Sequence, residues 1–250
     1  MSTKGSLLLI ATWLSVLPYS TAVVNGQDVE VGEFAWIAWG SCNGALVSPR
    51  HVITAKHCYN PATHDPAKLA NITVSFNKTS AKERGHEMRK ITKISLNMEV
   101  DVAILTLSRR VNIKPIGLPA IDSDYTGKTI TLAGPGCDQP HPYHSPEVLQ
   151  KVDLRVIPIR ECGKVHGKAN SLTDSRWLCA TSPVRFPWRS GCSGDSGSPM
   201  FACGAASGDC ALVAVVSRRG PGPWNGQGDS VGSKVSSILP WIKTILDSDQ

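Results

Sequence analysis

The chain has 250 residues and a formal net charge of +6, from 26 Lys or Arg against 20 Asp or Glu. This excess is scattered, its densest points are the pairs Arg109-Arg110 and Arg218-Arg219, and no aromatic residues alternate with them. Such a distribution argues against nucleic-acid binding. None of the 8 cysteines are spaced as C-x-x-C, which argues against a zinc site.

The N-terminal segment, residues 1–22, is predicted to be a secretory signal that is not part of the fold. Lys4 is followed by an apolar stretch from Leu7 to Leu17, and Ser20-Thr21-Ala22 forms a small-x-small cleavage site. This apolar stretch is too short to span a membrane, and no other segment is long and apolar enough. We therefore expect a secreted, extracellular protein that begins at Val23 and has no membrane partner.

The cysteines and two sequons fit the secretory pathway. All 8 cysteines follow the signal, and an even number in a secreted chain predicts four disulfides. Asn71-Ile72-Thr73 and Asn77-Lys78-Thr79 are acceptors for N-glycosylation, so we expect a glycoprotein with both asparagines on an exposed loop.

Short β-branched runs bounded by Gly, Pro, Asn or Asp dominate the rest of the chain and predict an all-β sandwich or barrel. In chain order these runs are GALVSP, HVITA, NITVSF, DVAILTL, TITLAG, KVDLRVIPI and CALVAVVS. A Pro-rich segment at 136–147 is the longest expected loop and roughly halves the chain. Near the end, Ile238, Trp241, Ile242 and Ile245 recur at spacings of three and four, which predicts one amphipathic helix.

Three residues offer the chemistry of a nucleophilic serine, which needs a base to accept its proton and an acceptor to orient that base. His57 lies in VITAKHC, Asp101 begins DVAILTL, and Ser196 lies in the glycine-rich run SGCSGDSGSPMF at 190–201. Each alone has a structural reading: a histidine beside a cysteine, an aspartate capping a strand, or a surface turn. Their order and their flanking residues make the set specific.

With these flanks the mature chain resembles the chymotrypsin–trypsin family of serine proteases. VVNG at Val23 is similar to the mature N-terminus of that family, SCNGALVSPRHVITAKHC to the histidine segment, GCSGDSGSP to the nucleophile loop and LPWI to the closing helix. The resemblance implies two antiparallel six-stranded β-barrels with a C-terminal α-helix. We expect the N-terminal barrel at about 23–130, the C-terminal barrel at about 131–250 and the site in the crevice between them.

The resemblance also assigns catalytic roles. His57 is the general base and then the general acid, Asp101 orients it and Ser196 is the nucleophile. The N–H groups of Gly194 and Ser196 form the oxyanion hole, and Asp195 pairs with the free amino group of Val23. Relatives usually carry a propeptide ending in Arg or Lys, whereas Ala22 precedes Val23 here. Either signal peptidase itself exposes Val23 or another enzyme removes a short propeptide.

The disulfide pairing implied by the family is only partly met. Cys42–Cys58 matches the histidine-loop bridge and Cys162–Cys179 the bridge below the nucleophile loop. The usual partner of Cys192 is missing, so we expect Cys137–Cys192 and a hairpin bridge Cys203–Cys210, with re-pairing of these four cysteines left open.

Specificity is the least determined property. By resemblance Ser190 forms the pocket floor, where an aspartate would select Lys or Arg, so a trypsin-like preference is disfavoured. Ser217 lines the triad, and Arg219 replaces a glycine that keeps the pocket open, so that it either narrows the pocket, attracts an acidic side chain or points to solvent. Ser230 is expected on the far wall, with Asp229 as the alternative that would restore basic specificity.

By the same resemblance, Lys56 stands where the family prefers a small residue, and its cation either crowds His57, lowers the pKa of His57 or extends into solvent.

We therefore expect a secreted serine endopeptidase that acts on protein or peptide substrates, meets protein protease inhibitors, is monomeric and uses no cofactor or metal. An α/β-hydrolase is excluded because Ser198 breaks G-x-S-x-G and no histidine follows Ser196. The remaining alternative is a catalytically silent homologue that binds or inhibits a partner.

Overall fold

The computed structural model describes residues 23–59, 72–80, 82–83, 87–137, 139–140, 143–144, 147–162, 174–185, 187–204, 209–219 and 228–248. The predicted signal segment, Asn71 and the side chain of Arg219 lie outside what is described. In the described part of the chain, no helix has both the length and the apolar character needed to cross a bilayer.

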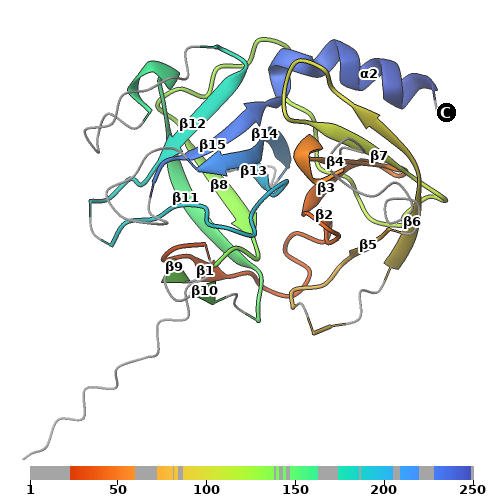
Figure 1. The fold of residues 1–250 in the computed structure, drawn as a ribbon, viewed down its shortest axis with the longest axis horizontal. Helices are drawn as coiled ribbons and strands as arrows, with labels where there is room; N and C mark the ends of the chain where they lie inside the picture. Colours follow the sequence, from red (N-terminus) through yellow and green to blue (C-terminus); the bar gives the residue numbers. More distant parts are fainter. Residues whose placement is uncertain are drawn as a thin grey trace, which may run out of the picture.

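The first sheet is a six-stranded antiparallel barrel (Figure 1). Its strands, in spatial order, are β2 (Ile37–Ala38), β3 (Gly44–Ser48), β4 (His51–Thr54), β7 (Ala103–Leu107), β6 (Glu87–Leu96) and β5 (Thr73–Phe76). Trp39, just after β2, and Ser75 of β5 exchange two backbone hydrogen bonds of 2.9 Å, which close the barrel. Strand β7 is buried along its whole length, so the residues just before it are held by a rigid element.

The second sheet has seven strands, of which six close into a barrel. In order they are β1 (Gln27–Asp28), β11 (Gln150–Ile157), β12 (Trp177–Thr181), β15 (Ser230–Lys234), β14 (Cys210–Arg219), β13 (Pro199–Cys203) and β8 (Thr129–Gly134), with β8 also pairing to β11. Buried and less buried residues alternate along β11, as expected of a strand with one face in a core. Strand β1 adds the start of the chain to this second barrel.

The remaining elements connect or cover the barrels. A small hairpin of β9 (Gln139–Pro140) and β10 (Tyr143–His144) lies within the expected Pro-rich loop. Single 3₁₀ turns occur at η1 (Lys56–Cys58), η2 (Ile159–Glu161) and η4 (Val235–Ile238). The α-helix α2 (Leu239–Ser248) follows η4 and buries Leu239, Ile242 and Ile245. Two six-stranded antiparallel barrels with a C-terminal helix confirm the predicted fold class.

One hydrophobic core runs across the boundary between the barrels. Phe201 on β13 of the second barrel contacts the rings of Phe34 and Trp36, which precede the first barrel, with centroids 4.8 and 5.1 Å apart. The apolar face of α2 belongs to the same cluster as the core of the first barrel. This shared burial favours a fixed relation between the two barrels.

Four disulfides join Cys42 to Cys58, Cys137 to Cys192, Cys162 to Cys179 and Cys203 to Cys210. The first and third are the pairs implied by the resemblance, and the other two are the pairs expected for the four cysteines whose pairing was left open. Cys42–Cys58 connects the start of β3 to the turn that contains His57, and Cys137–Cys192 connects the end of β8 to the Ser196 loop.

Candidate active site

His57 and Asp101 meet because their strands are paired. Strand β4 runs antiparallel to β7 with Thr54 opposite Ala103, so the residues after β4 and those before β7 lie at the same edge of the sheet. His57 comes three residues after Thr54, in η1, and Asp101 comes two residues before Ala103. The local sequence thus brings both side chains to one point.

Three hydrogen bonds converge on the carboxylate of Asp101. Its Oδ2 lies 2.7 Å from Nδ1 of His57 and accepts the hydroxyl of Ser217 at 2.6 Å, while Oδ1 accepts the backbone N–H of His57 at 2.8 Å. An ionised carboxylate only accepts hydrogen bonds, so Nδ1 of His57 carries the proton. In the neutral ring Nε2 is then unprotonated and can accept a proton from a nucleophile.

The pair shifts the pKa values of both groups in opposite directions. The hydrogen bond to Asp101 raises the pKa of His57 above its ordinary 6.5, and the carboxylate charge adds to this, although partial burial of the ring acts the other way. For Asp101 burial is the largest influence and acts to raise its pKa, but the hydrogen bonds from His57 and Ser217 together outweigh it and lower the pKa. The carboxylate therefore stays charged and favours the protonated imidazole.

Asn43 connects the histidine turn, which is the 3₁₀ turn η1 with His57, to the loop that contains Ser196. Its backbone N–H donates to the carbonyl of Ser196 at 3.1 Å, and its side-chain Nδ2 donates to the carbonyl of Gly194 at 3.0 Å. The carbonyl of Asn43 in turn accepts the hydroxyl of Thr54 at 2.6 Å. Because Asn43 is buried and adjoins Cys42, it fixes the serine loop to the turn that bears His57.

Gly197 permits this close approach. Its φ is +80°, and a Cβ there would lie 2.1 Å from the carbonyl oxygen of Asn43 and 2.6 Å from Oγ1 of Thr54. Only glycine fits such a position.

The backbone before Ser196 leaves two amide donors unused. Gly194 has a φ of 99°, and within the described residues neither its N–H nor that of Ser196 donates a hydrogen bond. Asp195 between them is fully buried, and its carboxylate accepts the N–H groups of Gly136 at 2.9 Å and Cys192 at 2.7 Å. This anchored carboxylate holds the glycine-rich loop in place and leaves those two N–H groups available.

Val23 is fully buried among core residues of the second barrel, and the next residue, Val24, forms an isolated β-bridge with Ser190. Val23 and Val24 are therefore built into the same barrel as Asp195.

A cavity of about 240 Å³ opens beside Ser196. Its lining residues are Gly191, Cys192, Ser193, Ser196, Val216, Ser217, Arg218 and Ser230. Three of the residues expected at a substrate site, Ser196, Ser217 and Ser230, thus meet at one cavity. Ser190 is buried and is not in this lining, although its neighbour Gly191 is.

The alternative that Asp229 faces the substrate is not what the structure shows. Asp229 is fully buried, and one of its carboxylate oxygens lies within 4.8 Å of the sulfurs of Cys162 and Cys179. Ser230 instead lines the cavity, where its hydroxyl accepts the N–H of Gly191 at 2.8 Å.

Lys56 neither crowds His57 nor simply extends into solvent. Its Nζ donates to the backbone carbonyl of Asn97 at 2.8 Å, in the loop that leads to Asp101. Sequence reasoning missed this contact, the role of Asn43 and the place of Arg218 in the cavity wall. For Asn43 a signal existed, because a residue next to a bridged cysteine of the histidine loop is held close to His57.

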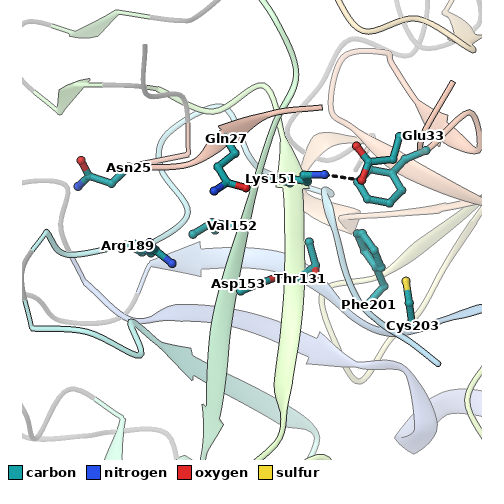
Figure 2. Close-up of a pocket in the computed structure, with 11 residues that line it drawn as sticks. Asn25, Gln27, Glu33, Thr131, Lys151, Val152, Asp153, Arg189, Phe201 and Cys203 are labelled. Atoms are coloured by element: carbon teal, nitrogen blue, oxygen red, sulfur yellow. Dashed lines mark hydrogen bonds and ion pairs between the residues drawn. The ribbon is translucent and has the colours of Figure 1, made fainter. Parts of the chain in front are cut away.

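A second cavity of about 340 Å³ lies away from these residues, between β1, β8, β11 and β13 (Figure 2). Figure 2 shows Asn25, Gln27 and Arg189 on one side of it, and the ion pair of Lys151 with Glu33 on the other. None of the candidate catalytic residues line it.

Comparison with known proteins agrees with this arrangement. Residues 23–242 match the family model described as trypsin, which covers most of the chain and both barrels. The chain belongs to the trypsin family. Relatives of this trypsin-family chain include human cathepsin G, at 27% identity over 97% of the chain and 94% of that protein.

Trypsin-1 of Astacus astacus is 28% identical over 88% of this chain and 98% of its own length. Trypsin 5G1 of Aedes aegypti is 29% identical over 98% of this chain and 92% of its own length. In each of these relatives the similarity extends over nearly the whole chain.

Proposed function

We propose that this trypsin-family protein is a secreted serine endopeptidase in which Ser196 attacks the substrate, His57 transfers the proton and Asp101 orients His57. The observation that carries the proposal is the hydrogen-bonded pair of His57 and Asp101, joined through Asn43 to the Ser196 loop. The unused N–H groups of Gly194 and Ser196 support an oxyanion hole beside the nucleophile.

The reaction follows from the proton positions. Oγ of Ser196 bonds to the carbonyl carbon of the peptide and its proton passes to Nε2 of His57, while the carbonyl oxygen gains the negative charge. The N–H groups of Gly194 and Ser196 stabilise that oxyanion, and removal of one such donor typically costs about 10²–10³-fold in rate. His57 then gives the proton to the leaving nitrogen as the C–N bond breaks.

The second half of the reaction reverses these roles. The oxygen of a water molecule bonds to the acyl carbon while its proton passes to Nε2 of His57. The ester bond between that carbon and Oγ of Ser196 then breaks, Oγ takes the proton back from His57, and the carboxylic acid product leaves. Throughout, the imidazolium is stabilised by the charge of Asp101, which itself keeps its proton-free state because its pKa is lowered.

Activation is proposed to depend on Asp195. Once the chain begins at Val23, its ammonium group can pair with the buried carboxylate of Asp195, and both residues are fully buried in the second barrel. Signal peptidase alone produces this end if it cleaves after Ala22, whereas a short propeptide would require a second protease.

The extracellular setting, glycosylation at Asn71 and Asn77, and protein protease inhibitors as partners of a monomeric enzyme are further parts of this proposal. Four disulfides support an oxidising compartment.

A fluorophosphonate probe tests the assignment, because it reacts only with a serine that is activated next to an oxyanion hole. We expect the secreted protein to be labelled at Ser196, and the Ser196→Ala variant not to be labelled. Mass analysis of the same sample identifies the first residue of the chain. Absence of labelling in folded protein that begins at Val23 would favour the catalytically silent binding protein, and absence with residues before Val23 would indicate a zymogen.

A further inference from the structure

The strand beside the cavity has an open edge next to the nucleophile. Strand β13 pairs with β14 as far as Pro199 opposite Val215, and Val216 still exchanges backbone hydrogen bonds with Gly197 and Ser198. Beyond Val216, within the described residues, β14 pairs only with β15. Ser217 in this part also donates to Asp101. An extended peptide can add to such an edge by backbone hydrogen bonds, with alternate side chains directed to the protein surface.

Arg218 supplies an uncommitted positive charge at that edge. Its side chain is exposed and its guanidinium carbon lies 4.5 Å from the centroid of the Trp177 ring. Among the described residues no carboxylate forms an ion pair with it. Contact with an aromatic face restrains a guanidinium without using its N–H donors, which remain available for a carboxylate.

Three acidic groups around the site are engaged elsewhere. Asp101 is bonded to His57 and Ser217, and Asp195 to two backbone N–H groups. Glu99 forms an ion pair of 3.0 Å with Arg176. The residues that line the cavity beside Ser196 include Arg218 and no acidic residue. The cavity wall is therefore positively charged.

We infer that Arg218 selects substrates with an aspartate or glutamate on the acyl side of the bond that is cut. The inference rests on the proposed function, since it names the substrate class of the same site. A carboxylate placed near Arg218 accepts N–H groups of the guanidinium, in the paired geometry that arginine favours. A lysine or arginine at the same place meets a like charge and is rejected.

A peptide library that varies each position before the cut tests this selection. We expect wild-type protein to cleave peptides with Asp or Glu at one acyl-side position about tenfold faster than the Asn or Gln analogues. Arg218→Met should abolish this ratio, and Arg218→Glu should shift the preference to Lys or Arg. Arg155→Met, which removes an exposed cation on β11, serves as the control and should leave the ratio unchanged.

A peptide-binding measurement tests the role of Arg218 independently of the proposed enzymatic function, because binding requires no catalysis. In the Ser196→Ala background, a product peptide that carries Asp or Glu at the preferred position should bind about tenfold more tightly than the same peptide with Asn or Gln there. The difference should decrease at high salt and disappear with Arg218→Met. An acid preference that persists in Arg218→Met, or equal binding of both peptides, would overturn the role of Arg218. A lack of fluorophosphonate labelling would overturn only the enzymatic proposal.

Discussion

Lys56 Nζ lies 2.8 Å from the backbone carbonyl oxygen of Asn97, and this contact joins the histidine turn to the loop that carries Asp101. The loop is ordered by Asn97, whose Oδ1 accepts the N–H groups of Glu99 at 2.9 Å and Val100 at 3.0 Å. Lys56 and His57 are adjacent in η1. The lysine therefore supports the same geometry as the hydrogen bond between His57 and Asp101.

Replacement of this lysine tests its positioning role. Lys56→Met keeps most of the aliphatic side chain and removes the donor, so we expect the free energy of unfolding to decrease by about 1 kcal/mol. We also expect kcat to fall several-fold with little change in KM, because Asp101 is held less firmly. Lys56→Arg retains a donor and should restore most of kcat. Urea unfolding and peptide kinetics measure both effects, and equal kcat in the methionine variant would contradict the role.

The pH dependence of activity follows from the raised pKa of His57. Only the neutral imidazole accepts a proton from Ser196, so kcat/KM should increase with pH through the pKa of His57. Because the hydrogen bond to Asp101 raises this pKa, the inflection should lie above the ordinary value of 6.5.

The same shift affects stability with the opposite pH trend. Because the pKa of His57 is higher in the folded than in the unfolded chain, its protonation stabilises the fold. This stabilisation is fully present below the pKa of the unfolded chain, and it is lost as the pH increases through the pKa of the folded protein.

Asp101→Asn is the matched variant for this prediction. It removes the charge, so we expect the inflection in kcat/KM to move to lower pH and the rate to fall by about 10⁴-fold. A pH–rate profile of both proteins is sufficient. An unchanged inflection in the variant would mean that another group controls the rate.

The sequence predicted strands whose apolar pattern is uninterrupted or alternates regularly, but not strands in which charged, glycine or serine residues interrupt it. Strands β4 and β7, for example, fall within HVITA and DVAILTL. Strand β6 was not predicted, because its residues are charged and mostly not buried. Strand β15 was not predicted either, because Gly and Ser interrupt its apolar pattern, although neighbours on both sides bury most of it.

A similar limit applies to the candidate site. The triad residues lie in motifs that a sequence displays directly. The contacts of Lys56 with Asn97 and of Asn43 with Gly194 join segments that are 41 and 151 residues apart. No local pattern encodes such contacts, since they depend on how the barrels pack.

Two glycines with nearly the same φ allow the effect of backbone strain to be distinguished from that of steric crowding. Gly197 and Gly127 have φ values of +80° and +78°, but an added Cβ meets nothing within 4 Å at Gly127. Gly127→Ala should therefore cost about 1 kcal/mol of folding free energy, from backbone strain alone. Gly197→Ala should cost more and displace the Ser196 loop from Asn43, so that fluorophosphonate labelling is lost. Equal stability and labelling of the two variants would show that the contact with Asn43 is not required.

Asp195→Asn tests the role of the buried carboxylate that lies between the two proposed oxyanion donors, Gly194 and Ser196. An asparagine keeps the volume but directs its NH₂ group at one of the two backbone N–H donors, from Gly136 or Cys192. It also removes the charge that the ammonium group of Val23 would neutralise. We expect a loss of about 3 kcal/mol in folding free energy. Labelling of Ser196 should be at least about 10²-fold slower, because both oxyanion donors lose their support.

A chain with extra residues before Val23 is the matched comparison. It keeps the carboxylate but has no free amine at that position, so its labelling should be as slow as that of Asp195→Asn while its fold keeps both hydrogen bonds to Asp195. Thermal unfolding and labelling rates, measured on both proteins, distinguish the two contributions. Rapid labelling of the extended chain would show that the hydrogen bonds from Gly136 and Cys192 alone hold the loop in its active form, with no need for the ion pair.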